Sequence, residues 1–285
     1  EIDYHWYMTY RYFVFIMLLP VLVGCSSMAS QKLSANLASS IVNQDDPATV
    51  RAAIPAYLLL MEGMLKDDPQ NPRLLVSVSR LYGAYAGSLV DEPVRSRKLY
   101  GHARVYARKA LCIKEPAVCE AEARDFQIFT ASLEDFDVSS LNELFVYATR
   151  YADWIGSNAG DWNSLMFLPY VEAMLQKVVS LEPGYANGRA QLYLAVIKSQ
   201  LPASLGGKPE SGREHFEMAL QYSAGRDLMV KVMFAQTYAR LVFDQALHDR
   251  LLSEVIASNP VVQDLTLSNV LAQRKAQTLL KDGYF

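Results

Sequence analysis

The chain has 285 residues, of which 51% are hydrophobic and 20% are charged. This composition excludes a disordered, collagenous or low-complexity protein. The net charge of −3 provides no basic field for nucleic acid, and three cysteines are too few for a disulfide-dense scaffold.

The first feature along the chain is an apolar run over residues 13–23, preceded by the single cation Arg11. The run is about half the ~20 residues that a membrane-spanning helix needs, and it is typical of a secretory signal. We therefore predict a signal peptide over residues 1–24, with Met8 as the true start. The run ends in Leu22-Val23-Gly24-Cys25, which resembles the bacterial lipobox. That resemblance implies lipidation of Cys25; the alternative is an ordinary signal followed by a chance cysteine.

The sequence after Cys25 sets the expected location. Residues 25–45 are expected to form the lipidated N-terminus and a tether. Ser26 and Ser27 follow the cysteine and no aspartate does, which by analogy with Gram-negative sorting implies the outer membrane. The expected location is thus periplasm-facing and lipid-anchored, held to the membrane by acyl chains.

Residues 46–285 are expected to form one all-α domain, because helical spacing recurs and hairpin signals are nearly absent. Asp46-Pro47 predicts a capped helix start, and Ser140 with Glu143 has the form of a capping box. The expected helices cover residues 47–66, 72–90, 94–113, 117–133, 140–157, 162–181, 185–201, 210–223, 226–243, 246–258 and 263–281.

Several expected helices end in the same way, with an apolar residue followed by proline five positions later. The pairs are Met64 and Pro69, Leu111 and Pro116, Val178 and Pro183, and Val255 and Pro260. This pattern favours degenerate tetratricopeptide-like helical hairpins that form a compact α-solenoid. The spacing between pairs is irregular, so a generic helical bundle with prolines at helix ends remains the alternative.

Several longer motifs resemble one known family. They are Tyr147-Ala-Thr-Arg-Tyr-Ala-Asp-Trp154, Leu181-Glu-Pro-Gly-Tyr185, Leu201-Pro-Ala-Ser-Leu-Gly-Gly-Lys208, His215-Phe-Glu-Met-Ala-Leu220, Asn269-Val-Leu-Ala272 and Leu279-Leu-Lys-Asp-Gly-Tyr-Phe285. Together they resemble the T-component of TRAP transporter systems, from about residue 45 to the end. The resemblance implies an all-α periplasmic lipoprotein, a homotrimer, and a pore through each protomer. It also implies a periplasmic solute-binding protein as partner and a lipophilic small molecule as ligand. No motif marks the pore-lining residues.

Two segments are candidates for ligand or partner contacts. Tyr147, Tyr151 and Trp154 share one helical face, where they either line an apolar channel or pack in the core. Leu205, Gly206 and Gly207 lie in a loop that is long for a helical hairpin. This loop forms either a channel mouth or partner surface, or a packed structural connection.

The cysteines and histidines offer little for catalysis. Cys112 and Cys119 flank Pro116 at a helix junction and are expected to form a disulfide in an oxidising compartment, although two buried thiols are the alternative. His102, His215 and His248 have no second ligand at metal spacing, and no nucleophile motif occurs. We expect no metal, no cofactor and no enzyme activity.

Two functions fit this sequence. The first is a membrane-anchored periplasmic lipoprotein that binds a solute-binding protein, and a hydrophobic ligand, in a TRAP-associated uptake system. The second is an outer-membrane assembly scaffold or adapter, also built from tetratricopeptide-like helices. The anchor and the repeats fit both; only the loop and the C-terminal motifs favour the first.

Overall fold

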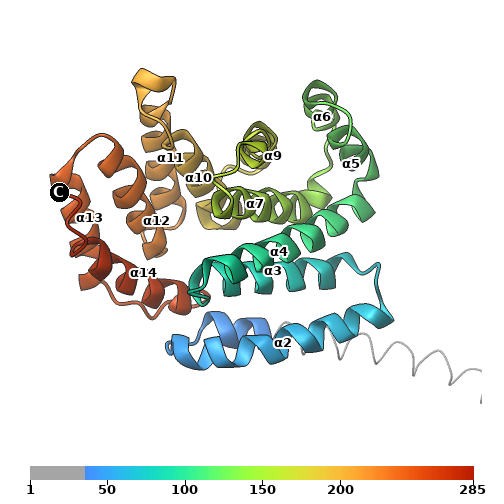
Figure 1. The fold of residues 1–285 in the computed structure, drawn as a ribbon, viewed down its shortest axis with the longest axis horizontal. Coiled ribbons are helices and arrows are strands. Elements are labelled where there is room, and N and C mark those ends of the chain that lie inside the picture. Colours follow the sequence, from blue (N-terminus) through green and yellow to red (C-terminus); the bar gives the residue numbers. More distant parts are fainter. Residues whose placement is uncertain (1–35) are drawn as a thin grey trace, which may run out of the picture.

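The computed structural model describes residues 36–285, and within this range the chain is helical without strands (Figure 1). The predicted signal peptide, Met8 and Cys25 lie outside the described residues. The first half contains a helical stretch over residues 36–42, then α2 (Pro47–Asp67), α3 (Pro72–Ser88), α4 (Pro93–Lys114), α5 (Pro116–Glu122), α6 (Phe126–Ser132), the 3₁₀ turn η1 (Val138–Ser140) and α7 (Leu141–Ser157). The second half contains α8 (Trp162–Leu165), α9 (Leu168–Leu181), α10 (Tyr185–Lys198), η2 (Ala203–Leu205), α11 (Pro209–Tyr222), α12 (Leu228–Met233), the π-helical segment η3 (Phe234–Ala239), α13 (Gln245–Ala257) and α14 (Thr266–Leu279).

Helix starts follow the local sequence. Asp46 caps α2 by accepting hydrogen bonds from the backbone N–H groups of Ala48 and Thr49, at 3.0 and 3.2 Å, and Pro47 occupies the first helical position. The expected capping box at Ser140 does not form: Ser140 makes no side-chain cap bond, and Glu143 is buried and pairs with Lys114 at 3.5 Å. A tertiary ion pair has taken the carboxylate that a local cap would use.

Two expected helices are each divided in two. The predicted helix over 117–133 breaks after Glu122, and Asp125 starts α6 by accepting from the N–H of Ile128 at 2.8 Å. The predicted helix over 162–181 breaks between α8 and α9, where Pro169 lies in the first turn of the new helix. In both places residues that favour helix starts stand inside an apolar pattern that continues through the break.

The helices form successive antiparallel hairpins, among them α3 with α4, α7 with α9, and α10 with α11 (Figure 1). Helices α3, α7 and α10 run in the same direction. Arg80 and Gly83 of α3 lie beside Asn142 and Arg150 of α7, in that order. Tyr185 and Tyr193 of α10 meet the same two residues of α7 in the same order. Parallel alternate helices are what stacked helical hairpins produce.

The first turn of α10 is left-handed. Ala186, Asn187 and Gly188 have φ values of 52°, 57° and 82°. A Cβ on Gly188 would lie 3.1 Å from the Cα of Ala219, so α11 approaches the backbone here too closely for a side chain. The turn brings two helices of one hairpin together.

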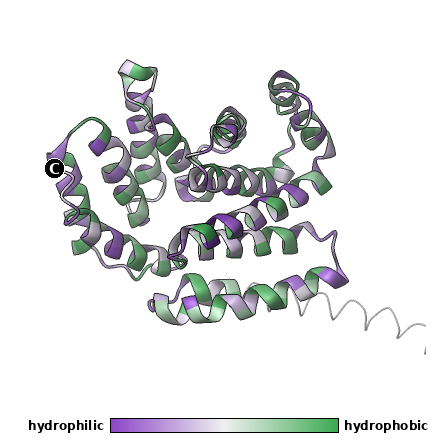
Figure 2. Ribbon diagram, in the orientation of Figure 1, coloured by the Kyte–Doolittle hydropathy of each residue, from purple (hydrophilic) through white to green (hydrophobic). Residues whose placement is uncertain are grey.

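Two hydrophobic cores fill the body, and hydrophobic residues recur along the helices that surround them (Figure 2). The larger core lies among α2 to α10 and includes Leu267 of α14, and the smaller one lies among α10 to α14. Helix α10 contributes Leu194 to the first and Leu192 to the second, so it joins the two halves. By length and mean hydropathy α2 is apolar enough to cross a membrane, but it packs on the larger core through Ile54, Leu58 and Met61.

The chain also closes on itself. Helix α2 contacts both α3 and α14, near the two ends of the described chain (Figure 1). Before α2, the Nδ2 of Asn43 donates to Oδ1 of Asp264 at 3.2 Å, and the N–H of Asp264 donates back to Oδ1 of Asn43 at 2.7 Å. The row of hairpins is therefore joined at its ends.

Candidate ligand and partner surfaces

The aromatic stripe of α7 lies in the larger core. Tyr147 and Tyr151 are buried, with ring centroids 5.4 Å apart, and Trp154 is half-buried, 6.0 Å from Tyr151. The guanidinium of Arg104 stacks on Tyr151 and Trp154, at 4.5 and 4.2 Å from the ring centres. The three residues share one face as predicted, and this face packs against α4.

Tyr147 finds a partner for its hydroxyl inside the protein. The phenol donates to Oε1 of Glu122, and the other carboxylate oxygen of Glu122 accepts from Nε of Arg108 at 2.8 Å. Burial raises the pKa of Tyr147, and the adjacent Glu122 carboxylate raises it further. The phenol therefore stays protonated and acts as a structural hydrogen-bond donor.

The aromatic row continues beyond α7 to the surface. The ring of Tyr151 lies 5.6 Å from Phe167, Phe167 lies 5.9 Å from Tyr170, and Tyr170 lies 5.1 Å from Phe126 of α6. Phe126 and Phe167 are partly exposed. The row thus connects the interior with the space between α6 and α9.

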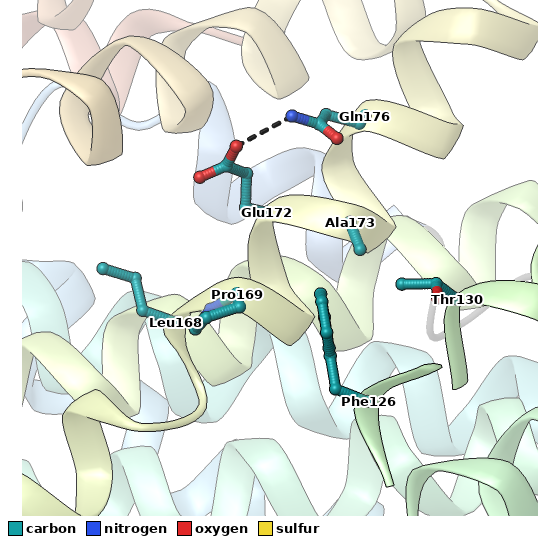
Figure 3. Close-up of a pocket in the computed structure, with 7 residues that line it drawn as sticks. All are labelled: Phe126, Thr130, Leu168, Pro169, Glu172, Ala173 and Gln176. Carbon is teal, nitrogen blue, oxygen red and sulfur yellow. Dashed lines mark hydrogen bonds between the residues drawn. The ribbon is translucent and has the colours of Figure 1, made fainter. Parts of the chain in front are cut away.

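That space is a pocket, which we call the α6–α9 pocket (Figure 3). Its volume is about 260 Å³, and it is lined by Phe126, Thr130, Leu168, Pro169, Glu172, Ala173 and Gln176. Most of the lining is apolar. Its polar side is Glu172, which accepts from Nε2 of Gln176 at 2.8 Å and from Nζ of Lys198 at 2.5 Å. An apolar hollow with one fixed polar side is suited to a small lipophilic molecule.

Two large apolar side chains project near the start of α9. Trp162, the first residue of α8, is 82% exposed, and Met166, which caps the end of α8, is 70% exposed. Exposed tryptophan and methionine are typical of protein contact surfaces. We call this pair the α8 knob.

A second pocket lies where the chain closes. It has a volume of about 430 Å³ and is lined by Pro47, Ala48, Arg51, Ala52, Ser88, Leu89, Leu271 and Arg274. These residues come from α2, the end of α3 and α14. Arg51 is paired with Asp91 at 2.7 Å, so this pocket has fewer free charges than its lining suggests.

The loop over residues 201–208 projects from the end of the α10–α11 hairpin (Figure 1). Leu205 is 68% exposed, and Gly206 has a φ of 83°. A Cβ on Gly207 would lie 1.8 Å from the carbonyl oxygen of Leu201, so that position needs glycine. The glycines close the loop tightly and leave Leu205 outside.

The structure joins Cys112 and Cys119 by a disulfide across the junction of α4 and α5, with 5.6 Å between the two Cα atoms. The histidines have separate surroundings. His102 stacks on Tyr82, Nδ1 of His215 lies 2.6 Å from Oε1 of Gln191, and Nδ1 of His248 lies 2.8 Å from Asp249. Among residues 36–285 no group of His, Cys, Asp or Glu is arranged to hold a metal ion.

A polar cluster between α3, α7 and α10 was not predicted from the sequence. Nη2 of Arg150 lies 3.1 Å from Oδ2 of Asp153 and donates to Oη of Tyr193 at 3.2 Å. Tyr193 in turn donates to Oδ1 of Asp153 at 2.9 Å. Gly83 and Gly87 make room for the cluster, because Cβ atoms there would lie 1.9 Å from Nη1 of Arg150 and 2.6 Å from Oη of Tyr100. The i, i+4 glycine pair was the available signal.

Two comparisons with known proteins found matches to this chain. The family model described as TRAP transporter T-component matches residues 43–285, which is most of the chain. A curated protein of Treponema pallidum (strain Nichols), described as an uncharacterized protein, is 24% identical over 276 residues. That alignment covers 86% of this chain and 81% of the relative. The match extends from Asn43, just before α2, through the whole helical body. The chain therefore belongs to the TRAP transporter T-component family.

Proposed function

We propose that this protein is a periplasmic, membrane-anchored component of a TRAP-associated uptake system that binds a solute-binding protein and a lipophilic ligand. The family supports a role as a TRAP transporter-associated component. The proposal adds a ligand site, a docking surface and a membrane anchor to that assignment.

The observation that carries the ligand site is the aromatic row that ends at the α6–α9 pocket. Tyr170 contacts both Phe126 and Phe129, so the apolar pocket wall is continuous with the buried core. A molecule bound there would cover exposed aromatic surface. Burial of apolar surface contributes a favourable free energy of about 25 cal/mol per Å². We therefore place the lipophilic ligand in this pocket.

The neutral dye Nile red tests this site. It should bind the purified helical body with increased fluorescence, and Phe126→Ser should weaken binding several-fold. Val94→Ser is a matched control, because Val94 is also exposed but lies at the start of α4. Equal binding by the wild type and Phe126→Ser would reject the α6–α9 pocket as the ligand site.

We place the docking surface for the solute-binding protein at the α8 knob. The body, immobilised and exposed to periplasmic extract, should retain a solute-binding protein that is identified by mass spectrometry. Trp162→Ala should abolish retention, and Val94→Ala should not. Failure of the wild type to retain any solute-binding protein would contradict the proposed function.

The proposed membrane anchor is a set of acyl chains on Cys25, and it is supported by the resemblance of residues 22–25 to the lipobox. Full-length protein expressed in a Gram-negative host should fractionate with outer membranes and carry acyl chains on Cys25, whereas Cys25→Ser should be released. Homotrimer formation is part of the same proposal, and light scattering of the purified body measures it. A soluble wild-type protein without acyl chains would reject the anchor.

A further inference from the structure

One exposed face of α4 is rich in cations. The helix contains seven lysines and arginines and no aspartate or glutamate. Arg95, Lys98, His102, Val105 and Lys109 follow one another at alternating intervals of three and four residues, so they lie on one face of the helix, and all five are exposed. We call these five residues the α4 stripe. The opposite face of α4 is buried in the larger core.

Ion pairs do not neutralise the α4 stripe. In the described part of the chain, the ion pairs of α4 join Arg108 to Glu122 at 2.8 Å and Lys114 to Glu143 at 3.5 Å. Neither pair includes a residue of the stripe. The charges of the stripe are therefore directed at solvent and are available to an external anion.

The neighbouring helices bring little negative charge to this face. Helix α3, which packs along α4, contains two arginines and no acidic residue. Glu62 of α2 approaches α4 at Tyr106, whose hydroxyl donates to it at 2.8 Å.

Charge is separated along this part of the sequence. Residues 72–114 hold nine lysines and arginines and two carboxylates, whereas residues 115–143 hold eight carboxylates and one arginine. The whole chain has a net charge of only −3, so the positive charge is concentrated on α3 and α4. A concentrated field of this kind attracts and orients the protein at an anionic surface.

The α4 stripe starts at the end of the molecule where the chain enters α2. Arg51, in the second turn of α2, pairs at 2.7 Å with Asp91, just before α4 (Figure 1). From there the stripe runs over residues 95–109, which is about 20 Å of helix at 1.5 Å per residue. Val105, within the stripe, is 60% exposed. A long convex row of cations with an apolar side chain among them suits an extended anionic plane better than a small ligand.

We propose that the α4 stripe lies on the surface of a bilayer that contains anionic phospholipid, with Arg95, Lys98 and Lys109 at the lipid phosphates and Val105 at the level of the headgroups. The proposal deepens the membrane location proposed above and rests on it. A bilayer is favoured over an acidic protein because the stripe starts where the chain arrives from the proposed anchor at Cys25. Basic segments beside a membrane anchor add binding energy at an anionic leaflet.

Vesicle sedimentation tests the α4 stripe. The mature chain, residues 25–285, carries Cys25→Ser for this purpose, so that it has no acyl chains. It should sediment with vesicles of phosphatidylcholine and phosphatidylglycerol in equal parts, and stay in solution with phosphatidylcholine alone. Added salt should release it, because salt screens exposed charges. Lys98→Gln combined with Lys109→Gln should weaken binding by about tenfold or more, as expected for the loss of two cations at an anionic surface.

Lys66→Gln combined with Lys281→Gln is the matched control. Both lysines are exposed, and the double substitution removes the same charge from the end of α2 and from the stretch after α14. Its binding should equal that of the chain with Cys25→Ser alone. Circular dichroism checks that both double variants are folded.

Three outcomes would overturn the proposal. They are equal sedimentation with the two kinds of vesicle, no effect of the stripe substitutions, and an equal effect of the control substitutions. Loss of solute-binding-protein retention in the stripe variant, without vesicle binding by the chain with Cys25→Ser alone, would also overturn it and assign the stripe to an acidic protein. Acylation of wild-type Cys25 is measured separately, so failure of the stripe and failure of the anchor are distinguished.

Discussion

Asn43 and Asp264 hydrogen-bond to each other in both directions, although 221 residues separate them in the chain. Asp264 has a φ of 64°, a left-handed conformation that aspartate tolerates better than most residues. The pair links the stretch before α2 to the stretch before α14. It therefore holds the starts of α2 and α14 close to each other.

Removing this pair should loosen both ends. We expect Asn43→Ala to lower the free energy of unfolding by about 1 kcal/mol, the usual value for a net hydrogen bond. Hydrogen exchange should speed up in the first turns of α2 and α14 together. Ser40→Ala is the control, because Ser40 bonds only to the carbonyl of Asn36. Faster exchange in α2 alone would contradict the link.

Gly83 should resist substitution, whereas Gly63 should not. Gly83→Ala places a methyl group 1.9 Å from Nη1 of Arg150 and should destabilise the protein by about 1–3 kcal/mol, despite the better helix propensity of alanine. Gly63→Ala meets nothing within 4 Å and should stabilise α2 by about 0.5–1 kcal/mol. Denaturant unfolding of the two variants measures the contrast. Equal effects would mean that Arg150 moves aside at little cost.

The disulfide between Cys112 and Cys119 is checked by peptide mapping without reductant. The two peptides should be recovered linked. Replacing both cysteines by serine should lower the free energy of unfolding by about 2 kcal/mol, because the bond closes a short loop. Recovery of both thiols free from periplasmic protein would disprove the bond.

His215 should make stability depend on pH. Burial lowers its pKa from the ordinary value of 6.5, and the positive charge of Lys198 lowers it further. The unfolded chain then binds a proton more readily than the folded one. The stability that the neutral His215 allows is therefore fully present above pH 6.5, and the free energy of unfolding decreases as the pH falls below that value. Urea unfolding measures this effect at pH 8 and at pH 5. Between these two pH values, the free energy of unfolding should decrease less for His215→Gln than for the wild type. An unchanged difference between the two pH values would show that His215 does not contribute.

Local residue chemistry predicted most helix starts, and long-range contacts decided the exceptions. Asp46-Pro47 caps α2 as expected because both partners are neighbours in sequence. The break before α6 was missed because the signal, Asp125, stands within a continuous apolar pattern. The π-helical segment at Phe234–Ala239 lies within the helix expected over 226–243, and nothing in that pattern distinguishes it.

The candidate sites were harder to predict for the same reason. Spacing placed Tyr147, Tyr151 and Trp154 on one face, but only the fold shows that this face meets Arg104 and leads through Phe167 to α6. The polar cluster of Arg150, Asp153 and Tyr193 joins α7 to α10, which are far apart in the sequence. The i, i+4 spacing of Gly83 and Gly87 permits a close approach of helices, but only the fold shows that a guanidinium and a phenol fill that space.

The contact between α2 and α14 has a mechanical consequence. In an open stack of helical hairpins, each hairpin contacts only its neighbours, so the stack can extend along its length. Here α2 and α14 contact each other. A force applied to the stretch before α2 therefore acts directly on α14, and it does not separate the hairpins one after another from one end. Relative movement of the hairpins would then require this contact to release first.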